Sequence, residues 1–303
     1  CSRDAGRPTR TLGWLGACLA TVLLSIPMGC SAPNADSPEA DPAPTSVLIR
    51  ADRVYDGLVF HDSSSILVVD GKVARMDTPP VDAPDAQVIL DLGDATLFPG
   101  FIELHAHSSF ARVPHDTLLR HGITTIRDLN GEVHQPYGGE GSLRVLTSGP
   151  SLTAPGGYPI VTFGASSPSV AVSTEDQARA AVASNVEGGA VIIKIALEPG
   201  HEAGAPWSGG KDHTPVHGDG DATPWPMLSE SVVAAIVDEA HELDRKVIAH
   251  VGERRGAEIS LAAGVDEWAH VPCDALPQEL LERAAQQGIK VVMDYVMNHT
   301  HQN

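Results

Sequence analysis

Pro99-Gly100-Phe101-Ile102-Glu103-Leu104-His105-Ala106-His107 is the stretch of the sequence that says most about its fold. Side chains two positions apart on a strand point to the same face of a sheet, so His105 and His107 are expected to project together. Two imidazoles on one face can chelate one metal ion. Such a pair also occurs on strands by chance, so it indicates a metal site only if other ligands lie nearby.

The sequence after this stretch alternates apolar runs with amphipathic segments. Strands are predicted at residues 97–105, 123–129, 145–152, 190–197, 246–251, 267–271 and 289–296. Helices are predicted at residues 174–186, 229–243 and 277–287, where apolar side chains recur every three or four positions. Strands that alternate with helices favour parallel βαβ units. Residues 97–303 are therefore predicted to form an α/β domain, a TIM-like (β/α)8 barrel without its eighth strand. A doubly wound open sheet is the alternative.

Residues 47–96 have a different pattern, with short strands and no helix. The predicted strands are residues 47–50, 54–57, 65–69, 72–76 and 87–91. Asp70-Gly71 between two of them is typical of a hairpin turn, because both residues tolerate the backbone angles that the turn requires. This segment is predicted to form part of a small β-sandwich.

The first 29 residues are predicted to be a secretory signal. Three arginines precede an apolar run, a pattern typical of such signals: Arg3, Arg7 and Arg10, then residues 12–28. Gly29-Cys30 resembles the end of a bacterial lipoprotein signal, in which Cys30 is lipidated and becomes the mature N-terminus. An uncleaved membrane anchor and an ordinary signal peptide are the alternatives. Residues 30–46 are rich in Pro and poor in large apolar residues, which predicts a disordered linker. The protein is thus expected to be a membrane-anchored lipoprotein of a bacterial cell envelope.

The composition argues against a nucleic-acid partner and against a fold held together by disulfide bonds. The net charge is −19, whereas a nucleic-acid binder needs basic patches that replace the counterions of the phosphates. Nucleic acid is therefore not an expected partner. Of the four cysteines, only Cys30 and Cys273 would remain after cleavage at Cys30, so no disulfide framework is predicted.

Three residues further along the chain strengthen the metal-site hypothesis. Lys194 lies inside an apolar strand, where an ammonium group is costly to bury without a partner or a modification. His250 and His270 each stand at the end of a predicted strand. Barrel enzymes place their catalytic groups at this rim, the C-terminal ends of the strands. His105, His107, Lys194, His250 and His270 are therefore predicted to converge.

The quoted stretch, followed by Gly122-Ile123-Thr124-Thr125-Ile126-Arg127-Asp128, resembles the metal-dependent amidohydrolase superfamily. It is most similar to the imidazolonepropionase-like and Xaa-Pro dipeptidase-like branch, and the resemblance covers residues 47–303. It implies that His105 and His107 bind one metal ion. It further implies that Lys194, carboxylated by carbon dioxide, bridges two metals, the second held by His250 and His270. One or two divalent ions are expected, and zinc is the metal that histidine ligands favour.

The sequence departs from the family in two places. The family completes its site with an Asp at the end of the eighth strand, a group expected beyond Asn303. Asp294 belongs to the predicted seventh strand and is not expected to replace it. Tyr158 stands where the nearest branch often has His, and it is a candidate substrate contact or hydrogen-bond donor to an oxyanion. Residues 1–303 alone are therefore expected to be an inactive, C-terminally truncated form.

These features together predict a hydrolase of carbon–nitrogen bonds. A metal-activated water would attack an amide, a cyclic amide or a dipeptide bond of a small-molecule substrate. The alternative is a non-catalytic, envelope-anchored protein that binds a metal or a ligand on a degenerate barrel. Fold and metal ligands do not specify the substrate, and the oligomeric state stays open as well.

Overall fold

The structure is a computed structural model, and it describes residues 46–200, 224–272 and 275–293. The predicted signal, the linker up to residue 45 and the lipidation site Cys30 lie outside the described residues, as does Asp294. Among the helices in these three ranges, none is both long enough and apolar enough to cross a membrane.

The N-terminal region forms one sheet. Its strands are β1 (Ser46–Tyr55), β2 (Phe60–Val69), β3 (Lys72–Asp77), β4 (Val88–Asp91) and β5 (Thr96–Leu97). The order is β3-β2-β1-β4, and β5 also pairs with β1. Two of the predicted strands merge into β1, because its pairing with β2 continues from Ser46 to Tyr55. The predicted hairpin turn joins β2 to β3, where Asp70 and Gly71 have φ angles of 49° and 74°.

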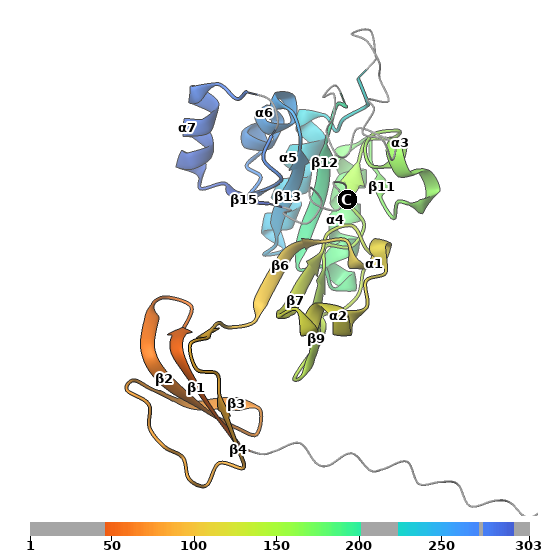
Figure 1. The fold of residues 1–303 in the computed structure, drawn as a ribbon. Helices are drawn as coiled ribbons and strands as arrows, with labels where there is room; N and C mark the ends of the chain where they lie inside the picture. The colour runs from red at the N-terminus through yellow and green to blue at the C-terminus, as the bar shows by residue number, and fades with distance from the viewer. Residues whose placement is uncertain (1–45, 201–223, 273–274, 294–303) are drawn as a thin grey trace, which may run out of the picture. The chain divides into compact units, whose positions relative to one another are not determined.

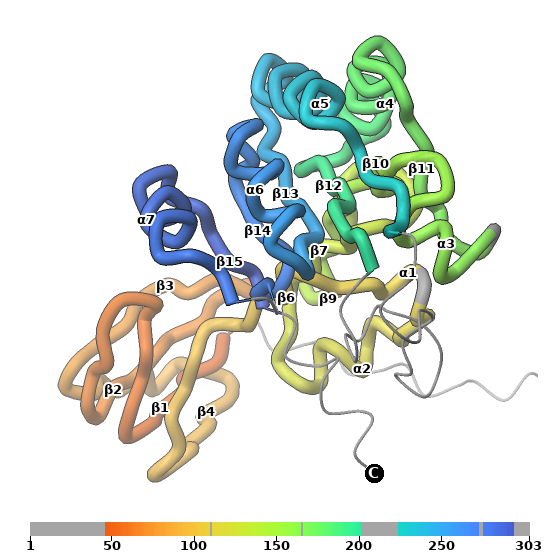
Figure 2. The backbone as a smooth tube through the Cα atoms, turned by 90° about the horizontal axis from the view of Figure 1, so that it is seen from above, coloured from red at the N-terminus to blue at the C-terminus, as the bar shows by residue number. Residues whose placement is uncertain are grey.

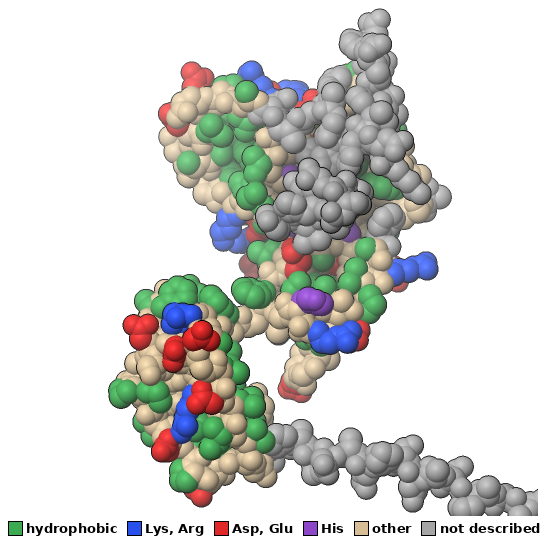
Figure 3. Space-filling view, viewed as in Figure 1, with side chains coloured by type: hydrophobic (Ala, Val, Ile, Leu, Met, Phe, Trp, Pro, Cys, Tyr) green, Lys and Arg blue, Asp and Glu red, His purple; other side chains and the backbone are tan. Residues whose placement is uncertain are grey.

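Exposed apolar side chains are frequent on this N-terminal sheet (Figure 3). They include Leu58, Val59, Phe60, Val73, Ile89 and Leu90. A sandwich buries such side chains between two packed sheets. Within the described residues this region is a single sheet, and the sandwich stays a prediction.

The rest of the described chain is built on parallel strands (Figure 1). One sheet has the order β6-β7-β9-β8, with β6 (Phe101–Ala106), β7 (Ile123–Asp128), β8 (Tyr137–Gly139) and β9 (Ser142–Thr147). The other has the order β11-β10-β12-β13-β14-β15. Its strands are β10 (Leu152–Thr153), β11 (Val170–Ala171), β12 (Ile192–Leu197), β13 (Lys246–Val251), β14 (Glu267–Ala269) and β15 (Lys290–Val292). Only β8 runs antiparallel to its neighbour in these two sheets.

Two of the predicted strands are interrupted. The strand predicted at residues 145–152 is divided into β9 and β10 by residues 148–151. Gly149 has a φ of 66° there, and Pro150 has no N–H to donate to a neighbouring strand. The strand predicted at residues 97–105 is broken before β6, where Pro99 and Gly100 interrupt the pairing. In the described residues the parallel strands form two sheets, and the break between β9 and β10 coincides with the division between them.

The three predicted helices are present as α4 (Glu175–Gly188), α5 (Glu230–Glu242) and α7 (Gln278–Gln287). The Thr174 and Ser229 side chains cap α4 and α5 by accepting backbone N–H groups. The sequence pattern did not predict four further helices: α1 (Ser108–Ala111), α2 (His115–Arg120), α3 (Ile160–Phe163) and α6 (Arg254–Ala263). A single 3-10 turn, η1 (Gly164–Ser166), follows α3.

The main core lies between helices α4 to α7 and the sheet that holds β12 and β13. Figure 2 shows α4, α5 and α6 along one side of these strands. A second apolar cluster forms on other residues of the same strands, and Leu129, directly after β7, joins it. Its members are Leu129, Ile192, Ile248, Ala269 and Val292. Residues of both parallel sheets therefore share one interior.

Candidate metal centre

The structure brings the five residues predicted as metal ligands together. His105 and His107 lie at the end of β6, Lys194 lies in β12, His250 in β13, and His270 directly after β14. The ring centroids are 5.0 Å apart for His105 and His107, 4.7 Å for His105 and His270, and 4.8 Å for His250 and His270. The Lys194 Nζ atom lies 3.5 Å from His105 Nε2. Their convergence is a geometric finding, whereas their role as metal ligands stays a prediction.

The backbone at His270 is held in an unusual conformation. Its φ is 87°, in the left-handed region that non-glycine residues seldom adopt. The His270 N–H donates to the Val292 carbonyl at 3.0 Å, which ties this residue to the end of β15. Backbone strain of this kind is often retained at functional sites, where the surrounding structure enforces it.

Burial keeps the four imidazoles neutral at physiological pH. His105 and His250 are each 3% exposed. Burial, followed by the nearby Lys194 ammonium, holds the pKa of both rings well below the ordinary value. The same two causes lower the pKa of His107 to about 4. Burial, together with His250 and Lys194, also lowers the pKa of His270. Neutral imidazole is the form that binds metals, so these rings are in the protonation state of ligands.

The residues present fit a divalent metal ion. The Nδ1 atom of His105 is buried and has no hydrogen-bond partner among the described residues. A buried ring nitrogen without a partner calls for an explanation, and an ion is one. No three His, Cys, Asp or Glu side chains of the described ranges already surround one point as a complete site. Side chains would therefore have to turn toward the ion, within a cluster whose rings are already neighbours.

Asp128 is a buried carboxylate of the site that the sequence reasoning did not select. It ends β7 and is 1% exposed. Its Oδ2 atom accepts hydrogen bonds from Ser108 Oγ at 2.8 Å, Ser109 N at 2.8 Å and Ser109 Oγ at 2.6 Å. It lies close enough to His107 to raise the pKa of that ring slightly against the larger effect of burial. Its place at a strand end was the signal that could have revealed it.

Glu198 is a second carboxylate that the sequence reasoning missed. It directly follows β12, and its side chain is completely buried. Its Oε1 atom accepts the Gly200 N–H at 2.8 Å, and its Oε2 atom lies 3.2 Å from His250 Nε2. The sequence offered one signal for Glu198: it is an acidic residue just beyond the strand that carries Lys194, and strand ends form the rim of the site.

Tyr158 lies beside the histidine cluster. Its ring centroid is 4.6 Å from that of His250, and Trp225 stacks parallel to it at 6.1 Å. Burial, with a smaller effect from Glu198, raises the pKa of the Tyr158 phenol. The hydroxyl group therefore stays protonated at neutral pH and can donate a hydrogen bond. The structure places this predicted residue at the site without assigning it a role.

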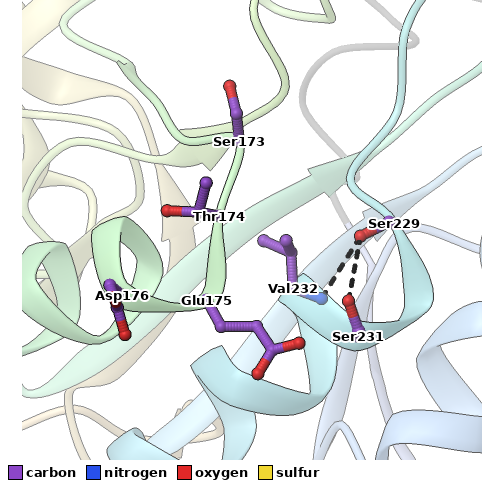
Figure 4. Close-up of a pocket in the computed structure, with 7 residues that line it drawn as sticks. All are labelled: Ser173, Thr174, Glu175, Asp176, Ser229, Ser231 and Val232. Carbon is purple, nitrogen blue, oxygen red and sulfur yellow. Dashed lines mark hydrogen bonds between the residues drawn. The ribbon is translucent and has the colours of Figure 1, made fainter.

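A separate hollow lies between the first turns of α4 and α5 (Figure 4). It is lined by Ser173, Thr174, Glu175, Asp176, Ser229, Ser231 and Val232. The Ser229 hydroxyl already accepts the Val232 N–H at 3.3 Å, and the two acids disfavour an anion. None of the predicted site residues lines this hollow, so it is not part of the candidate centre.

Comparison with known proteins supports the fold. No protein-family model and no curated protein sequence matches the chain. Among solved structures, a Xaa-Pro dipeptidase with bound methionine in its active site is similar, with a TM-score of 0.59 and 19% identity, over 81% of this chain and 66% of that one. An amidohydrolase has a TM-score of 0.58 and 24% identity, over 82% of this chain and 65% of that one. The A. niger ochratoxinase has a TM-score of 0.58 and 19% identity, over 82% of this chain and 64% of that one.

This chain spans less than two thirds of the length of each of these three proteins. At such identities the likeness concerns the fold, and it extends over most of this chain. The proteins that share the fold are the amidohydrolase-like enzymes that the motif around His105 and His107 indicated. The chain therefore has the fold of these amidohydrolase-like proteins, in agreement with the resemblance that its sequence motifs indicated.

Proposed function

We propose that this protein is a metal-dependent hydrolase of carbon–nitrogen bonds in small molecules. The observation that carries the proposal is the cluster of four neutral imidazoles around the buried Lys194. The structural neighbours named above are a dipeptidase, an amidohydrolase and ochratoxinase, all hydrolases by name. The alternative, a non-catalytic binding protein, receives no support from these comparisons.

The proposed scaffold is an incomplete (β/α)8 barrel. In this interpretation β9 and β10 count as one interrupted strand. The first seven strands of the barrel are then β6, β7, β9 with β10, β12, β13, β14 and β15. The parallel pairing in chain order supports it. The buried ion pair between Arg127 on β7 and Glu267 on β14 supports it as well, because this pair joins strands of the two sheets across the shared interior. The eighth strand would lie outside the described residues.

The histidines and Lys194 would hold the metal. A divalent ion bound there, zinc by the preference of histidine ligands, would lower the pKa of water and polarise a substrate carbonyl. His105 and His107 would form one side of the site, and His250 and His270 the other. Lys194 would bridge them as a carbamate, formed when its neutral amine bonds to the carbon of carbon dioxide and releases a proton. Its burial, at 4% exposure, supports this modification, because the carbamate replaces a buried cation with a ligand.

Tyr158 would act on the substrate. Its protonated hydroxyl group, beside His250, would donate a hydrogen bond to the oxygen that gains charge as the carbonyl is attacked. The proton that the leaving nitrogen needs would come from the acidic residue expected after Asn303. The whole protein would therefore require that residue in addition to those described here.

The test is metal uptake combined with hydrolysis. The 303-residue chain, and a longer chain wherever the coding sequence continues, would be loaded with zinc and offered Xaa-Pro dipeptides and N-acyl amino acids. We expect bound zinc in both and release of free amine by the longer chain. His107→Ala should abolish both properties, whereas His241→Ala, on the exposed side of α5, should change neither. A wild-type chain that binds no divalent metal would contradict the proposal.

A further inference from the structure

We infer that Glu198 is a further metal ligand, which shares its ion with His250. This inference rests on the proposed function and adds a residue to the proposed ligand set. Glu198 lies four positions after Lys194 in a segment that begins in β12. Side chains at even spacing along a strand point to the same side, so Lys194 and Glu198 are expected to face the same interior.

The distance between Glu198 and His250 is close to that of two ligands on one ion. Ligand atoms lie about 2.0–2.2 Å from a tetrahedral zinc ion, so two of them are separated by about 3.3–3.6 Å. The Oε2 atom of Glu198 is 3.2 Å from His250 Nε2, close to this range.

The surroundings of Glu198 also favour a cation. Its carboxylate is completely buried, and a buried carboxylate is costly unless charge and hydrogen bonds compensate it. The Gly200 N–H holds Oε1 at 2.8 Å, which orients the side chain and leaves Oε2 on the side of His250. A direct bond to a divalent ion would compensate the negative charge of the Glu198 carboxylate, and the carboxylate would in turn stabilise the bound ion. The imidazoles are neutral, so Glu198 would add its negative charge to that of the proposed Lys194 carbamate.

A rival explanation gives Glu198 only an orienting role. In that case the carboxylate accepts a hydrogen bond from His250 Nε2–H, and His250 binds the ion through its other ring nitrogen. The two explanations differ in what a glutamine would do at this position. The glutamine oxygen can still accept the hydrogen bond, but it is a poor zinc ligand because it carries no negative charge.

The first experiment measures zinc stoichiometry and affinity by competition with a chelator, on the 303-residue chain. Glu198→Gln should weaken zinc binding by more than about 100-fold, since loss of an orienting partner alone costs about 10–100-fold. The matched control is Glu239→Gln on α5, which removes the same charge at the Arg179 ion pair and should leave zinc affinity within about threefold. A loss of zinc affinity of about 100-fold or less in Glu198→Gln would overturn the inference in favour of the orienting role.

A second variant gives a direct spectroscopic reading. Glu198→Cys, loaded with Co²⁺, should show a sulfur-to-cobalt charge-transfer band, because a thiolate at a ligand position bonds to the ion. The wild-type spectrum, which includes any contribution of Cys273, is subtracted, and Glu239→Cys serves as the matched control. Absence of the band in a Glu198→Cys chain that retains cobalt would also overturn the inference. A wild-type chain without metal would instead contradict the proposed function itself, so the two failures are distinguishable.

Discussion

Arg127 and Glu267 form a buried ion pair, with Arg127 Nη2 2.7 Å from Glu267 Oε2, between two strands that lie 140 positions apart in the chain. The same guanidinium donates through Nε to the Leu104 carbonyl at 2.9 Å. Arg127 therefore connects β7, β14 and the residue just before His105. This pair is one polar connection between the two parallel sheets, and the contact of Lys194 Nζ with His105 Nε2 is another.

The first prediction concerns the stability of this pair. Arg127→Met leaves the Glu267 carboxylate buried without its partner, which should lower the free energy of unfolding by about 3–5 kcal/mol. The double variant Arg127→Met with Glu267→Leu removes both charges and should recover part of this loss. Urea unfolding of the metal-free chains measures both values. Equal stability of the single variant and the wild type would show that the pair does not hold the sheets together.

The second prediction concerns pH. The pKa of His107 is lowered from an unfolded value of 6.5 to about 4, so the unfolded state binds the proton more readily than the folded state. The stability of the metal-free chain is therefore complete above about pH 6.5 and is lost as the pH falls toward 4. His105, His250 and His270 shift in the same direction and add to the effect. Urea unfolding between pH 4 and 8 measures the slope, and His107→Gln should flatten it.

The third prediction concerns Tyr158. Tyr158→Phe keeps the ring between His250 and Trp225 but removes the hydroxyl group. In a form of the protein that hydrolyses a dipeptide, we expect kcat to fall on the order of 10²-fold, with metal content and thermal stability unchanged. Steady-state kinetics with a cleaved dipeptide checks this. An unchanged kcat would leave the residue a purely structural aromatic.

The fourth prediction concerns Gly256 in α6. Replacing Gly by Ala inside a helix usually stabilises a protein by about 1 kcal/mol. Here a Cβ atom on Gly256 would collide with the Leu197 carbonyl oxygen, at the end of the strand that precedes Glu198. Gly256→Ala should therefore lower the melting temperature, the opposite of the usual sign, as thermal unfolding would show. A higher melting temperature would mean that α6 can move away from β12 at little cost.

The fifth prediction concerns export. The order of basic, apolar and Gly29-Cys30 residues predicts cleavage before Cys30 and lipidation of its side chain. Expression in a bacterial host should yield a membrane-associated protein whose N-terminal peptide begins with acylated Cys30 in mass spectra. Cys30→Ser should abolish the acylation. Recovery of an intact segment from residue 12 to residue 28 would favour one of the alternatives, an uncleaved anchor.

Local patterns were enough to predict the parallel strands and the longer helices. Periodicity depends on neighbours in the chain, and β7, β12 and β13 begin within two residues of the predicted positions. The four histidines were predicted to converge because the C-terminal ends of parallel strands must meet at one edge. That argument needs only the order of strands, which the sequence by itself determined, and the structure indeed places the rings side by side.

Only the tertiary structure decided which acidic residues lie beside the four histidines. Glu198 and His250 are 52 positions apart, and Asp128 contacts serines about 20 positions before it. Burial distinguishes these carboxylates from the many exposed acids of a chain with a net charge of −19. Burial is set by the packing of distant segments, and no local pattern encodes it. The break between β9 and β10 had a local signal in Gly149-Pro150, but the hydrogen bond that Asn185 of α4 donates to the Pro150 carbonyl at 3.0 Å was visible only in the packed structure.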